Sequence, residues 1–159
     1  YIKPQPGRSV VWLGPMVGRN SAVEMAISIE EIWGEPGNTI ALDEQPLLIS
    51  EVSKTAAMRK KMADGTASPD EIAAFEAVQT SRAITAREEM VRLADTILDM
   101  RHEPMFMFGL WAQHLMIRDR ARERGIPDGD FHPETVIFPA GGIKGIKLPE
   151  DYREEGAAC

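Results

Sequence analysis

The segment FPAGGIKG, residues 138–145, has the residue types of a ligand-binding loop. Gly141 and Gly142 follow an apolar run, and Lys144 stands between them and a third glycine. Because the two glycines lack a Cβ, the backbone can take positive φ angles and a flat ligand such as a purine ring can approach the peptide plane. Paired glycines after a strand also serve as a plain tight turn, so the spacing alone leaves both interpretations open.

The elements around this segment predict a βαβ unit. The run EPMFMFG, residues 103–109, is apolar and flanked by Pro104 and Gly109, which favours a short buried strand. The run LWAQHLMIRDRARERG reads as a helix that ends at Gly125, and TVIFPA reads as a second buried strand. Strand, helix and strand within about 35 residues make the two strands parallel. In an open α/β sheet ligands bind at the carboxyl ends of the strands, where the glycine segment lies.

The first part of the chain predicts one further strand and helix. Residues 8–15, RSVVWLGP, are rich in strand-forming residues and end at Gly-Pro. The next segment is helical, with Ser21 and Glu24 at capping-box spacing and Val23, Ala26 and Ile27 on one face. A brief extended piece, NTIALDEQ, follows it.

Residues 46–101 predict a helical hairpin. Gly65 closes the first helix, and the second opens with Ser68 as the cap, Pro69 at the first helical position and Glu71 in the reciprocal capping place. Its apolar stripe gathers near the end, at Met90, Val91, Ala94, Ile97 and Leu98. The predicted fold class is therefore α/β, a piece of a larger domain, with a parallel βαβ unit over 104–155 and the hairpin inserted before it.

Composition excludes several classes of function. The chain has 159 residues, enough for one core, and 18 basic against 25 acidic residues give a formal charge of −7. Because no basic block stands out, we expect no nucleic-acid partner. The apolar runs are far shorter than the roughly 20 residues that cross a bilayer, so we expect a cytoplasmic protein without a membrane span. The chain starts at Tyr1 and its single cysteine is Cys159, and we expect it to be an excerpt.

Other candidate residues are better explained by structure than by chemistry. Asp128, Asp130, His132 and Glu134 alternate and could hold Mg²⁺ or Mn²⁺, but Asp, Gly and Pro are what a connecting loop uses, and we favour the loop. His114 lies on the apolar side of its helix, where a buried, hydrogen-bonded histidine is the favoured interpretation.

Three aromatic residues could line an acyl pocket. Phe106, Phe108 and Trp111 could equally fill the core between sheet and helix. Core is favoured, because large apolar side chains are normally inside.

Two segments, PMFMFGLWAQHLMIRDRARERGI and TVIFPAGGIKGIKLPEDYREE, resemble the middle of the adenylate-forming superfamily. The similarity is to the branch of the acyl-protein synthetases and phenylacetate-CoA ligase-like enzymes. In that branch a strand ends in Gly-Gly-(Gly)-x-Lys-Gly, and a helix begins near a Leu-Pro. Ala140 departs from the first of the three small positions. The resemblance covers 104–155, about a third of the chain.

The resemblance implies a two-step carboxylate ligase. A carboxylate attacks the α-phosphate of ATP to give an acyl-adenylate, and a thiol, either CoA or protein-bound, then takes the acyl group. ATP and Mg²⁺ belong to the complete enzyme, and we expect this chain alone to bind neither tightly. The implied wall of the nucleotide and acyl pocket comprises Ala140, Gly141, Gly142, Ile143 and Lys144. Lys144 has two open roles: it pairs with a phosphate or carboxylate, or it is a solvated lysine.

Several parts of such an enzyme are absent from the sequence. We find no Thr/Ser/Gly-rich phosphate loop, no Tyr-Gly-x-Thr-Glu segment and no C-terminal domain with its ribose-binding Asp and catalytic Lys. We therefore assign no catalytic residue or metal ligand and expect the chain alone to be inactive. The alternative is a non-catalytic α/β interaction domain in which the glycine loop is purely structural.

Overall fold

The computed structural model describes residues 7–15, 21–42, 49–139 and 148–153. The elements in chain order are β1 (Arg8–Pro15), α1 (Ser21–Trp33), β2 (Gly34–Leu42), α2 (Ile49–Ala63), α3 (Pro69–Asp99), β3 (Met105–Gly109), α4 (Trp111–Glu123) and β4 (Val136–Pro139).

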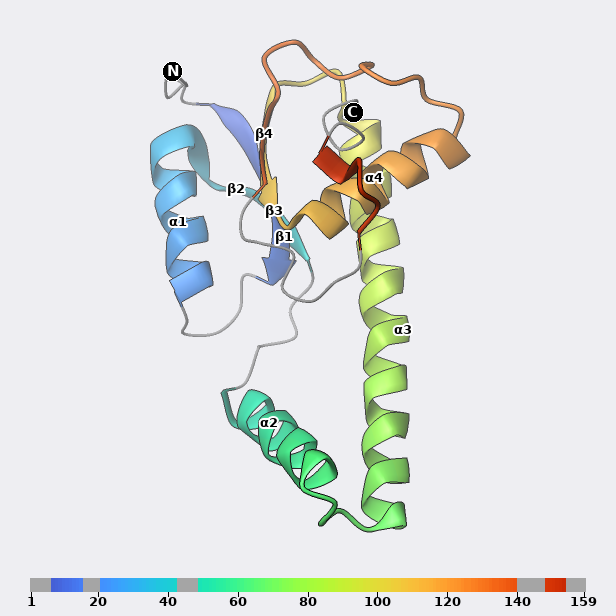
Figure 1. Cartoon of the computed structure of the whole chain (residues 1–159). Helices are drawn as coiled ribbons and strands as arrows, with labels where there is room; N and C mark the ends of the chain where they lie inside the picture. Colours follow the sequence, from blue (N-terminus) through green and yellow to red (C-terminus); the bar gives the residue numbers. More distant parts are fainter. Residues whose placement is uncertain (1–6, 16–20, 43–48, 140–147, 154–159) are drawn as a thin grey trace.

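The four strands form one parallel sheet in the order β2-β1-β3-β4. Phe106 of β3 lies opposite Val10 of β1 on one side and Val136 of β4 on the other. Helix α1 covers one face of this sheet, and α4 and the end of α3 cover the other face (Figure 1). The structure thus confirms the predicted α/β class, with a parallel βαβ unit and an inserted helical hairpin.

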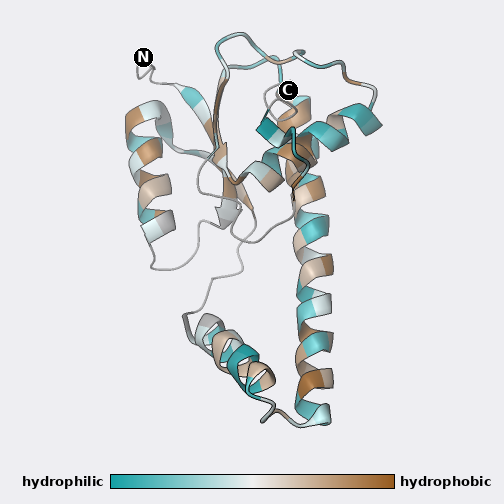
Figure 2. Ribbon diagram, viewed as in Figure 1, coloured by the Kyte–Doolittle hydropathy of each residue, from teal (hydrophilic) through white to brown (hydrophobic). Residues whose placement is uncertain are grey.

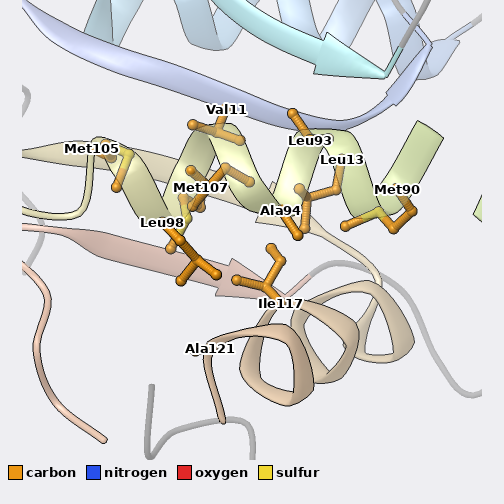
Figure 3. Packing of buried hydrophobic residues seen from close by; sticks show 11 residues of the cluster. Val11, Leu13, Met90, Leu93, Ala94, Leu98, Met105, Met107, Ile117 and Ala121 are labelled. Atoms are coloured by element: carbon orange, nitrogen blue, oxygen red, sulfur yellow. The ribbon is translucent and has the colours of Figure 1, made fainter. Parts of the chain in front are cut away.

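The larger core lies between the sheet and the helices α3 and α4 (Figure 3). Alternate residues of β1 and β3 point into it, because successive side chains of a strand face opposite sides of the sheet. The buried members of this cluster are Val11, Leu13, Met90, Leu93, Ala94, Ile97, Leu98, Met105, Met107, Ile117 and Ala121. Every residue of β3 is buried, as expected for a central strand that is covered on both faces.

The smaller core, under α1, is largely aromatic. Trp33 at the end of α1 stacks on Phe106, with 4.9 Å between ring centroids. Val23 and Ala26 are buried, as predicted, but Ile27 is exposed, and its assignment to the buried face was wrong. Each helical residue is rotated by about 100° from the one before it, which carries Ile27 past the edge of the contact with the sheet.

Strand β4 is not the buried strand that its apolar residues predicted. It pairs with β3 on one side and is the last strand of the described sheet. Helix α1 packs on β1 and β2, and Phe138 of β4 is 47% exposed. Apolar composition marked this segment as a strand, but its position at the edge of the sheet decided how much of it is covered.

Helices α2 and α3 form a hairpin that projects beyond the carboxyl ends of the strands (Figure 1). The predicted capping box is confirmed: the Glu71 amide donates to Ser68 Oγ at 3.2 Å, and the Ser68 amide donates to the Glu71 carboxylate at 2.9 Å. Only the last third of α3 reaches the core. Its buried residues are Met90, Leu93, Ala94, Ile97 and Leu98.

Arginines at the C-terminal end of α4 hold that helix against α3. Arg120 makes two hydrogen bonds to the Asp95 carboxylate, of 2.9 and 3.0 Å, and Arg124 reaches Asp99 at 2.6 Å. The hydrogen bonds from Arg120 keep the pKa of Asp95 below its usual value. This seam sets the register of the two helices along the sheet.

Although α3 has 31 residues, neither it nor another described helix has a stretch apolar enough to cross a membrane.

Removing buried volume from α3 should destabilise the whole domain. We expect Ile97→Ala to lower the free energy of unfolding by about 2–5 kcal/mol, because Ile97 is fully buried between α3 and the sheet. The matched control is Ile32→Ala, at a side chain of α1 that is 53% exposed. Urea unfolding followed by circular dichroism measures both. Equal losses in the two variants would contradict the position of Ile97 in the core.

Candidate functional site at the carboxyl edge of the sheet

The side of the sheet on which successive strands are added changes between β1 and β3. From β1 the chain moves through α1 to β2 on one side, and β3 and β4 then add on the other side. Open α/β sheets bind ligands in the crevice at such a switch point, beyond the carboxyl ends of the strands. The loop after β1, residues 16–20, lies outside the described residues, whereas the connection from Gly109 to Trp111 is described.

Gln113 joins the two strands that flank the switch point. Its side-chain amide donates a hydrogen bond to the carbonyl of Leu13 at the end of β1, and its carbonyl accepts one of 2.7 Å from the Leu110 amide. The sequence analysis missed this residue. A glutamine three positions after an uncapped helix start was the available signal, because it can reach back to the cap amide.

Gly109 and Gly14 allow close packing at this edge of the sheet. A Cβ on Gly109 would lie 2.5 Å from the Leu13 Cβ, and one on Gly14 would lie 2.6 Å from the Trp12 ring. Trp12 itself stacks on Phe108, with 4.5 Å between ring centroids. The space beside both glycines is therefore filled by the protein's own side chains.

Described residues before and after the glycine segment make contacts at the carboxyl edge of the sheet. At one end, Pro139 is paired with Gly109 at the end of β3. At the other end, the Tyr152 ring packs edge-on against Trp111, in the first turn of α4, with 5.4 Å between centroids.

The predicted wall residues themselves fall between these described residues in the sequence. Ala140, Gly141, Gly142, Ile143 and Lys144 lie outside the described residues. The structure therefore brings the two flanks of the segment to the carboxyl edge, and the pocket role of the five residues stays a prediction.

His114 is a buried histidine on α4. Its side chain is 2% exposed, as predicted, but its Nε2 has no hydrogen-bond partner among the described residues. Burial favours the neutral imidazole and lowers the pKa of His114 to about 4. At neutral pH the side chain is therefore uncharged.

The acidic loop before β4 is fixed by arginines. Asp130 bonds to Arg101 at 2.9 Å, and this hydrogen bond lowers the pKa of Asp130. Asp128 bonds to Arg122 at 3.1 Å. Glu134 lies 3.7 Å from Arg8, the first residue of β1. Across the described ranges, no three His, Cys, Asp or Glu side chains come together as a metal site.

The three aromatic candidates divide between two environments. Phe106 and Phe108 belong to the buried cluster under α1, which confirms the favoured core interpretation. Trp111 is half-buried and packs on Tyr152 beside the glycine segment.

Comparison with known proteins gives no relative: no family model, no curated protein and no solved structure matches this chain.

Acidification should destabilise the folded protein through His114. Between pH 7 and pH 5 we expect this histidine alone to cost roughly 2 kcal/mol of folding free energy. His114 binds a proton near pH 6.5 in the unfolded chain but only near pH 4 in the folded chain. The free energy of unfolding therefore falls as the pH drops from 6.5 to about 4, and it levels off below about pH 4. Urea midpoints at both pH values should show a smaller loss in His114→Leu than in the unmodified chain.

The matched control is His102→Gln, at an exposed histidine close to the start of β3. This variant should keep the full loss of stability on acidification. If the pH dependence of stability is the same in His114→Leu as in the unmodified chain, His114 is not buried and neutral in the folded protein.

Proposed function

We propose that this chain forms part of the adenylate-binding pocket of an ATP-dependent carboxylate ligase. The observation that carries the proposal is the position of the described residues on either side of the glycine segment. Its first flank is paired with the end of β3, and its second flank packs on the first turn of α4. In other open α/β proteins, nucleotides bind beyond the carboxyl ends of parallel strands, and the glycine segment follows such an end in the sequence.

In this proposal the backbone of Gly141 and Gly142 forms a flat wall against the ligand, with Ala140 and Ile143 beside it. Lys144 pairs with a phosphate or a carboxylate, or is solvated. Helix α4 begins at this edge with Leu110, whose own side chain makes no capping hydrogen bond, and the amides of a first helical turn favour a negatively charged group.

Activation would produce an acyl-adenylate and pyrophosphate. The carboxylate oxygen attacks the α-phosphorus of ATP, and pyrophosphate leaves. A thiol of CoA or of a carrier protein then takes the acyl group, and AMP is released. Mg²⁺ would accompany the ATP phosphates, with ligands outside the described residues.

A bulky side chain at Gly142 should abolish this activity. We expect Gly142→Val to reduce carboxylate-dependent exchange of pyrophosphate into ATP by at least about a hundredfold, because the γ-methyl groups would occupy the space of the ligand. The measurement uses the complete product of the gene. Thermal unfolding should be unchanged.

Ala83→Val serves as the control, since it adds two methyl groups at an exposed position of α3. Gly142→Ala should fall between the control and the valine variant. Exchange at the unmodified rate in a folded Gly142→Val variant would refute the wall role of this glycine, and absence of exchange with a broad panel of carboxylates would refute the ligase.

The second candidate is a non-catalytic interaction domain, and one specific feature favours it. The projecting hairpin carries an open apolar cleft between α2 and α3, of about 400 Å³. If this chain is such an interaction domain, it binds a partner through this cleft and its glycine segment serves only as a turn. It would then show no nucleotide-dependent activity.

A further inference from the structure

The hairpin holds an apolar cleft that nothing in the described chain fills. Met58 of α2 and Ala74, Phe75 and Val78 of α3 supply its apolar lining, and Val78 is 49% exposed. Charged side chains surround this floor. They are Glu51, Lys54, Glu71 and Arg82.

The two helices receive little support from each other or from the domain. The buried residues of α3 all lie between Met90 and Leu98, and residues 80–88 are exposed without interruption. In Figures 1 and 2, this part of α3 extends away from the sheet, and α2 diverges from it. Helices in proteins owe most of their stability to the packing of an apolar face, and this face is still open.

An exposed stripe runs along α3 beside the cleft. Ala74, Ala77, Ser81 and Ile84 recur at alternating spacings of three and four residues, and all four are exposed. This spacing places side chains on one face of a helix. Because three of the four are small, another helix backbone can approach closely along this face.

The two helices carry opposite charge. Helix α2 has four basic residues and one acidic residue, whereas residues 69–89 of α3 have five acidic and two basic residues. Two ion pairs already cross the cleft within the chain, Arg82 with Glu51 at 2.9 Å and Lys61 with Glu71 at 2.8 Å. An acidic surface and a basic surface thus lie side by side on one hairpin.

We propose that this cleft is closed by the same hairpin of a second copy, in an antiparallel arrangement about a two-fold axis. Helix α2 of each copy then lies against α3 of the other, and the four helices form a bundle. Such a contact requires a surface that complements itself. A mainly basic α2 beside a mainly acidic α3 meets this requirement, because the two-fold axis places the basic helix of each copy opposite the acidic helix of the other.

The antiparallel arrangement also fixes which ends of the helices meet. The last turn of α2, with Lys60 and Lys61, lies near the tip of the hairpin, and Glu88 and Glu89 lie near its base. The axis therefore brings Lys60 and Lys61 of one copy to Glu88 and Glu89 of the other. Val78 lies near the middle of the contact and faces Val78 of the partner subunit.

The first experiment places a charge at the centre of the contact. We expect the chain to sediment as a dimer in analytical ultracentrifugation, and Val78→Glu to raise the dimer dissociation constant at least about tenfold, because two buried glutamates would face each other. The control Ile32→Glu makes the same change at a similarly exposed apolar residue on α1 and should leave the constant unchanged. Circular dichroism confirms that each variant is folded.

A second experiment exchanges charges between copies. Lys60→Glu with Lys61→Glu should weaken self-association, and so should Glu88→Lys with Glu89→Lys. When these two variants are mixed, every α2 with reversed charge meets an α3 with reversed charge, and a heterodimer should form. Mixing cannot repair a fault within one chain, so recovery on mixing is specific to contact between copies.

Two results would overturn the proposal. The first is a monomeric chain at concentrations up to roughly 100 μM, where a weak specific dimer should be populated. The second is a dimer that withstands Val78→Glu and whose charge variants show no recovery on mixing. A helix of another protein bound in the cleft of a monomeric chain would also refute the second copy as the occupant.

Discussion

The pairing of β1 with β3 is the contact on which the rest of this structure depends. Met107 of β3 lies opposite Val11 of β1, and the lack of a side chain at Gly109 lets Leu13 pack against the end of β3. The helices α3 and α4 rest on one face of this pair and the aromatic cluster on the other. Because β2 and β4 add on opposite sides, this pair also creates the switch point at the carboxyl edge.

The same arrangement divides the molecule into two regions, and each of them carries one of the proposals. The carboxyl edge holds Gln113, the start of α4 and both flanks of the glycine segment. The hairpin leaves that core after the last third of α3, and its apolar cleft stays open. The proposed ligand site requires a fixed geometry, which elements packed on a core can supply, whereas the proposed contact with a second copy uses the projecting helices.

Local signals located most of the elements. Ser68, Pro69 and Glu71 predicted the start of α3. The change from a continuous apolar run to helical spacing separated β3 from α4. Burial was harder to predict, as Ile27 and Phe138 show, because it depends on which neighbouring element covers each position. Gln113 escaped notice for a related reason: one of its hydrogen bonds goes to Leu13, one hundred positions earlier in the chain.

The sequence by itself determined the parallel βαβ unit, the capped hairpin and the place of the glycine segment after β4. These features follow from short-range rules on spacing, capping and chain length that need no knowledge of the fold. Only the tertiary structure decided that β1 lies between β2 and β3, that Trp111 and Tyr152 meet beside the glycine segment, and that the face of α2 and α3 is left open. Each of these depends on contacts between residues far apart in the chain, which local spacing does not encode.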